Sequence, residues 1–102
     1  MDLGLLRKLF HQGHIRWTTH CLERMQERDI SIDDVENALL QGEMIEDYPD
    51  DYPHPSCLLD GRGRSGKRIH VVAGTDGEEI YVITAYEPNI IKFAEDGKTR
   101  RN

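Results

Sequence analysis

Residues 20–32 read HCLERMQERDISI, and this stretch decides the expected fold because it joins two helices through a tight corner. His20, Arg24 and Arg28 are spaced i, i+4 and i+8. Each step of four residues advances only about 40° around a helix, so the three side chains share a stripe about 80° wide. The apolar residues beside them place this stripe at the border of the buried face. Basic groups held along one border can be aimed at a single ligand.

The corner also contains the clearest helix start in the chain. Ser31 can accept a hydrogen bond from the backbone amide of Asp34, as an N-cap residue does. Ile30 and Val35 occupy the two positions of a hydrophobic staple. The helix that follows is expected to end at Gly42. The short corner predicts that the helices on its two sides form a packed pair.

Towards the N-terminus, apolar residues at helical spacing predict a first helix over residues 2–12. Residues 14–17 are expected to be a brief extended connector. Thr18 or Thr19 can cap the second helix, which is expected to run to about Arg28.

Towards the C-terminus the pattern changes from helices to strands. Strands are expected over residues 43–48, 56–60, 67–73 and 79–86, with a glycine-rich hairpin loop over residues 61–66. Helices followed by a meander of strands indicate an α+β fold. The sequence therefore predicts one domain, residues 1–102, in which N-terminal helices pack on a four-stranded antiparallel sheet.

Composition limits the classes of function. The chain has 102 residues and a net charge of −6, which repels nucleic acid, so a phosphate-binding surface has to be a local patch. The sequence contains neither an apolar run of membrane-spanning length nor a signal-peptide pattern, so we expect no membrane contact and a cytoplasmic location. Its two cysteines and its histidines lack the spacing of a zinc site, and we expect no metal and no cofactor.

Two further residues can join the helical stripe in one catalytic cleft. His70 lies in an apolar strand, and strict alternation in the last strand places Tyr86 on the same face as Ile80 and Val82. If the helix pair packs on this sheet, five residues can converge: His20, Arg24, Arg28, His70 and Tyr86. Such a set suits metal-independent RNA cleavage, with histidine or tyrosine moving protons and arginines stabilising the phosphate. Alternatively, His70 is a core residue and the arginines form ion pairs on the helix surface.

The glycine-rich hairpin carries the other candidate site. Four basic residues interleaved with glycine can contact phosphate, namely Arg62, Arg64, Lys67 and Arg68. The alternative interpretation is a solvated hairpin tip.

An ordered set of short motifs resembles a family of small bacterial proteins known as domain of unknown function 4258. The likeness runs from about Trp17 to Arg101. It rests on His20-x3-Arg24-x3-Arg28-x-Ile30-Ser31, Gly42-Glu43-x-Ile45-Glu46-x-Tyr48, Pro55-Ser56-Cys57-Leu58, Ile69-His70-Val71-Val72, Ile83-Thr84-x-Tyr86-x-Pro88 and Lys98-Thr99-Arg100-Arg101. The resemblance implies a RelE-like domain, similar to ribonuclease toxins that need no metal. It also implies a small zinc-finger protein of the antitoxin type as a partner.

Two hypotheses about function follow. The first is a toxin-like, metal-independent endoribonuclease of a toxin–antitoxin-like pair, with RNA as its substrate. The second is a non-catalytic binding module whose cleft or sheet edge docks a partner protein. The histidines and arginines favour the first hypothesis, and the acidic net charge favours the second.

Overall fold

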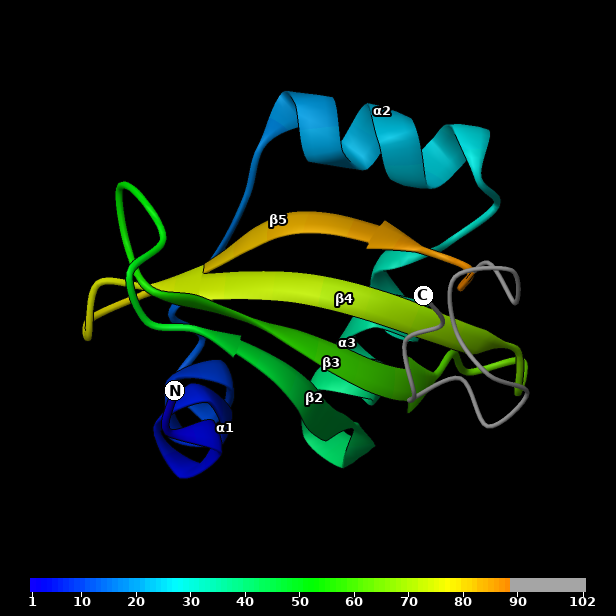
Figure 1. The fold of residues 1–102 in the computed structure, drawn as a ribbon. Helices are drawn as coiled ribbons and strands as arrows, with labels where there is room; N and C mark the ends of the chain where they lie inside the picture. Colours follow the sequence, from blue (N-terminus) through cyan, green and yellow to red (C-terminus); the bar gives the residue numbers. More distant parts are fainter. Residues whose placement is uncertain (89–102) are drawn as a thin grey trace, which may run out of the picture.

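The computed structural model describes residues 1–88, which form three helices and five strands (Figure 1). In chain order these are α1 (Leu3–His11), β1 (Ile15–Trp17), α2 (Thr19–Glu27), α3 (Ile32–Gln41), β2 (Glu43–Tyr48), β3 (Ser56–Arg62), β4 (Arg68–Thr75) and β5 (Ile80–Tyr86). The α+β class is therefore as predicted, but one strand of the sheet, β1, comes between α1 and α2. No described helix is long and apolar enough to cross a membrane.

The five strands form one mixed sheet in the order β1-β5-β4-β3-β2. The four longer strands are antiparallel to one another, but the prediction of a four-stranded antiparallel sheet is wrong by one strand. Ile15–Trp17, expected as a connector, pairs in parallel with β5 as β1. The guanidinium of Arg16 binds both carboxylate oxygens of Glu79, at 2.5 and 3.0 Å, and fixes this pairing. A three-residue strand is too short to show alternation in the sequence.

The helices share one hydrophobic core with one face of the sheet. Leu6 of α1, Met25 of α2 and Val35 of α3 are buried in the same cluster as Ile69 and Val71 of β4. Figure 1 shows α2 beside β5 and α3 behind β3 and β4. Because side chains alternate along a strand, every second residue of β4 faces away from the helices.

A bulge in β5 changes the face of its last residues. Val72 pairs with Thr84, whereas the next residue, Ala73, pairs with Val82, so Ile83 is the extra residue. After a bulge the alternation restarts on the other face. The expectation that Tyr86 shares a face with Val82 is therefore wrong, and Ala85 enters the core in its place.

The α2–α3 corner is built by two hydrogen-bonded caps. At the end of α2, Asp29 has φ +56°, and the amide of Ile30 donates to the carbonyl of Met25 at 2.8 Å. This is a Schellman motif, and both Met25 and Ile30 are buried against it. At the start of α3, Asp34 donates its amide to Ser31 Oγ, and Ser31 donates its amide to the Asp34 carboxylate, each at 3.0 Å. The predicted cap at Ser31 is confirmed.

Gly61 brings α3 close to the sheet. A Cβ atom at Gly61 would lie 2.8 Å from the Cβ and 2.9 Å from the Cα of Ala38 in α3. Only glycine permits this approach, which seats the start of the β3–β4 hairpin directly under the helix.

Candidate functional site

Four polar side chains form a row across the sheet, on the face opposite the helices. The register pairs Glu43 of β2 with Asp60 of β3, Asp60 with His70 of β4, and His70 with Tyr86 of β5. Directly paired residues of antiparallel strands project on the same side. We call these four residues the polar row. It collects two residues that the sequence nominated, His70 and Tyr86, and two that it did not, Glu43 and Asp60.

The centre of the polar row is a buried charged group. The His70 Nε2 atom lies 3.3 Å from Asp60 Oδ1, and the Arg68 Nε atom lies 3.6 Å from the same oxygen. His70 is fully buried, and Asp60 is almost so. Nε2 is the ring nitrogen of His70 that faces Asp60. The ring of Tyr86 meets that of His70 edge to face, with centroids 5.6 Å apart.

A pocket of about 250 Å³ opens beside this group. Its lining consists of Gln41, Glu43, Asp60, Gly61, Arg62 and Arg68. Arg62 and Arg68 are directly paired across β3 and β4, so both guanidinium groups belong to the face of the polar row. We call this hollow the arginine pocket. His70 is not part of this lining but lies beside Asp60, which is.

The basic stripe of α2 lies on a different part of the molecule. α2 runs beside β5 in the same direction (Figure 1), so Arg28 is at the Tyr86 end and His20 at the other. Eight residues of helix separate the two by about 12 Å. Arg28 donates to Thr84 Oγ1 at 3.1 Å and to the Ala85 carbonyl at 3.0 Å, which ties α2 to β5.

The two remaining residues of the stripe are exposed. Arg24 forms an ion pair with Glu27 at 2.9 Å on its own helix, as the alternative interpretation held. His20 is exposed in the first turn of α2. The structure thus brings His70 and Tyr86 together, places Arg28 against Thr84 and Ala85 of β5, and leaves His20 and Arg24 exposed on α2.

The basic hairpin is divided in two. Arg62 and Arg68 line the arginine pocket, whereas Arg64 and Lys67 face the start of α3. The backbone amide of Arg64 donates to Asp34 Oδ1 at 2.7 Å. Burial alone would raise the pKa of Asp34, but hydrogen bonds from the amides of Ser31 and Arg64 outweigh burial and hold that pKa below its ordinary value. The four residues therefore do not form one phosphate-binding surface.

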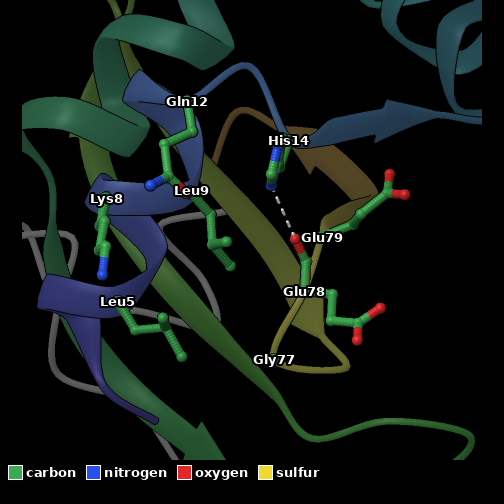
Figure 2. A pocket seen from close by; sticks show the side chains of 8 residues that line it. All are labelled: Leu5, Lys8, Leu9, Gln12, His14, Gly77, Glu78 and Glu79. Carbon is green, nitrogen blue, oxygen red and sulfur yellow. Dashed lines mark hydrogen bonds between the residues drawn. The ribbon is translucent and has the colours of Figure 1, made fainter.

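A larger hollow, of about 450 Å³, lies between α1 and the β4–β5 turn (Figure 2). Leu5 and Leu9 form its apolar wall, and the carboxylates of Glu78 and Glu79 point away from α1 in this view. His14 Nδ1 lies 3.2 Å from the carbonyl oxygen of Glu78 and donates to it. Lys8, His14, Glu78 and Glu79 are titratable residues of this lining, but none of the candidate residues from the sequence lines the hollow, so we do not regard it as the catalytic candidate.

Metal and thiol chemistry have no support in the described part of the chain. Residues 1–88 contain no group of three His, Cys, Asp or Glu side chains able to hold a metal ion. Burial raises the pKa of the Cys57 thiol to about 11 and also raises that of Cys21. Both cysteines are buried, and a protonated thiol is neither a nucleophile nor a metal ligand at neutral pH.

Comparison with known families now places the chain. Residues 17–87 match the family described as domain of unknown function DUF4258. The chain belongs to this family. No curated protein and no solved structure matches it. The DUF4258 match contains the polar row, the arginine pocket and the α2–α3 corner, whereas α1, which forms one wall of the hollow in Figure 2, lies outside it.

Asp60 and Glu43 are the site residues that sequence reasoning missed. A signal for Asp60 was present, because a hairpin pairs residues at equal distances from its tip. Arg62 pairs with Arg68 around the glycine-rich loop, and counting two residues outward on each strand pairs Asp60 with His70. Glu43 requires the register of a third strand, and no short turn determines that register.

Proposed function

We propose that this protein cleaves RNA without a metal at the arginine pocket, as a toxin-like relative of the RelE-like ribonucleases. The observation that carries the proposal is the direct pairing of Arg62 with Arg68 across β3 and β4. Like charges directly opposite each other destabilise a sheet. A phosphate between the two guanidinium groups removes this repulsion and accepts hydrogen bonds from both.

The surroundings of the pocket suit cleavage by transfer within the ribose. The Glu43 carboxylate, at the pocket wall, accepts the proton of the ribose 2′-hydroxyl. The 2′-oxygen then bonds to phosphorus while the bond from phosphorus to the 5′-oxygen breaks, and the leaving oxygen takes a proton from solvent. Arg62 and Arg68 stabilise the charge that builds up on the phosphate.

His70 and Asp60 serve as positioning residues in this proposal. Asp60 lies between the Nε atom of Arg68 and the Nε2 atom of His70, which restricts where the Arg68 guanidinium can point. Restraining an arginine before the substrate arrives lowers the entropy lost in the transition state. Tyr86 packs on His70 and completes this support.

The cellular setting belongs to the same proposal. We place the protein in the cytoplasm, where its RNA substrate is found, beside a small zinc-finger partner of the antitoxin type that restrains it. A net charge of −6 disfavours unaided RNA binding, which makes a local arginine pocket the place to look for contact with phosphate.

A non-catalytic binding module is the second candidate. It is favoured by the placement of His20 and Arg24 on the outer side of α2, away from the buried His70. With these candidate acid–base residues apart, the second candidate function is to dock a partner rather than to move protons.

The test is cleavage of labelled RNA by the purified protein in the presence of a chelator. We expect cleavage to persist in chelator and Arg62→Gln to lower its rate on the order of 10²-fold. Arg62 is exposed, so this variant should melt like the wild type. Lys8→Gln removes an exposed positive charge from α1 and should leave the rate unchanged.

Other outcomes separate the alternatives. Loss of cleavage in His20→Ala with full activity in Arg62→Gln would move the chemistry to α2 and overturn the arginine pocket as the site. A wild-type protein that cleaves no RNA would overturn the ribonuclease proposal and favour the binding module.

A further inference from the structure

An apolar groove lies in the α2–α3 corner, and no residue of the polar row lines it. Its lining consists of Leu22, Met25, Gln26, Asp29, Ile30, Ser31 and Ile32, around a volume of about 280 Å³. Met25 and Ile30 are buried and form the floor. Leu22 is 37% exposed and Ile32 43% exposed, although both are large aliphatic residues. We call this hollow the corner groove.

Hydrogen bonds of the two helix caps hold the backbone on both sides of the corner groove. The Schellman motif joins Ile30 to Met25, and the capping box joins Ser31 to Asp34. These caps fix both helix ends that border the groove. A surface that is already in shape binds without a large loss of conformational entropy.

The charged residue at the rim of the corner groove is acidic. Asp29 lines the groove and adopts a left-handed conformation that favours glycine. The ammonium group of Lys67 donates to the main-chain carbonyl of Asp29, not to its carboxylate. Asp33, next to Ile32 in the first turn of α3, does not line the groove but lies in the neighbouring hollow with Arg64 and Lys67; it is 62% exposed and 3.7 Å from Arg64. A partner that inserts an apolar side chain here meets the Asp29 carboxylate at the rim.

We infer that the corner groove docks an amphipathic, basic segment of a partner protein, which places a large apolar side chain between Leu22 and Ile32 and lysine or arginine near Asp29 and Asp33. A groove beside two helices is a common site for such a segment. A second copy of this chain fits less well, because two-fold pairing brings the same acidic rims together. This inference does not depend on RNA cleavage.

The experiment uses the full chain and two synthetic probes. One is an amphipathic leucine–lysine peptide about four helical turns long, and the other has glutamate in place of every lysine. We expect the lysine peptide to bind and to shift the amide resonances of residues 22–34 in NMR spectra. The glutamate peptide should not bind, and added salt should lower the affinity of the protein for the lysine peptide.

Matched variants decide whether the corner groove is the site. Leu22→Ser should lower the affinity for the lysine peptide on the order of 10-fold. Ile83→Ser is the control, since Ile83 is also an exposed aliphatic residue, 46% exposed, but lies at the bulge of β5. Both side chains are exposed, so both variants should melt close to the wild type.

Three results would overturn the inference. The first is equal binding of both peptides, and the second is an equal loss of affinity in Leu22→Ser and Ile83→Ser. The third is a wild-type dimer in sedimentation analysis that Leu22→Ser converts to monomer, because the occupant of the groove is then a second copy of the chain. Absence of RNA cleavage would leave this inference unaffected.

Discussion

The α2–α3 corner and the polar row are both well-defined polar structures, but they are assembled from different ranges of sequence. At the corner, the cap contacts join residues a few positions apart, such as Ser31 with Asp34 and Met25 with Ile30. In the polar row, each residue comes from a different strand; Asp60 of β3, for example, is paired with His70 of β4. The corner's geometry is therefore readable from one short stretch, whereas the row exists only once the strands are in register.

The two regions also differ in what their charges do. Around Asp34, backbone amides hold a single carboxylate, and the result is a cap that fixes a helix. Around Asp60, side chains from the neighbouring strand approach one buried carboxylate from two sides. Side-chain partners can be exchanged for a ligand, but backbone partners of a cap cannot be removed without loosening the helix. The carboxylate of Asp60 can therefore change partners without loss of a helix end, whereas the carboxylate of Asp34 supports the helix end that borders the corner groove.

Removal of the Asp60 carboxylate should have the largest effect. Asp60→Ala removes the carboxylate that lies 3.3 Å from the buried His70 and 3.6 Å from Arg68, and loss of one partner from a buried charged group costs about 3 kcal/mol. The measurement is the free energy of unfolding from urea denaturation. Asp60→Asn keeps the shape and should cost less. A change in unfolding free energy below about 1 kcal/mol in Asp60→Ala would show that the Asp60 carboxylate contributes little and that solvent takes its place.

The local elements of the fold were readable from the sequence for physical reasons. Ser31 and Gly42 bound α3 as expected, because caps act through hydrogen bonds to nearby amides and carbonyls. The four longer strands were also recognised, since each has flanking turn residues. β1 was not recognised, because three residues carry no period. The bulge at Ile83 was missed as well, because nothing in an alternating strand marks where the alternation restarts.

Only part of the candidate site could be predicted from the sequence. His70 and Tyr86 were nominated together, and the register does pair them. Their expected approach to His20 did not occur because the neighbours of His70 in β4, Ile69 and Val71, face the helices. A strand residue can face only one side of the sheet, so a histidine between two core residues points away from α2. The apolar neighbours alone would have given this result.

Removal of the Asp34 carboxylate should have the next largest effect and tests the local side of the comparison. Asp34→Ala removes the acceptor of two backbone amides, those of Ser31 and Arg64, and should cost about 2 kcal/mol. Asp33→Ala is the control, because its 3.7 Å contact with Arg64 is exposed and should be worth less than about 0.5 kcal/mol. Equal losses of unfolding free energy in Asp34→Ala and Asp33→Ala would mean that the cap stabilises the fold no more than an exposed surface charge does.

The smallest effect is expected at Asp76, in the turn between β4 and β5, where local contacts again hold a carboxylate. Backbone amides of Glu79 and Glu78, each donating at 2.9 Å, and the Tyr81 hydroxyl at 2.8 Å lower the pKa of Asp76 to about 2. A carboxyl group whose pKa is lower in the folded state stabilises the fold above its ordinary pKa, near 3.8. That contribution is lost as the pH falls from about 4 to about 2.

A titration of the Asp76 carboxyl carbon by NMR measures this midpoint directly. Tyr81→Phe removes one donor of the three and should move the midpoint upward while leaving the two backbone donors in place. Because those donors are on residues two and three positions further along the chain, most of the lowering should survive in the variant. A midpoint at the ordinary aspartate value in the wild-type protein would show that the turn is not closed in solution. The contrast between local contacts and strand register would then not extend to this turn.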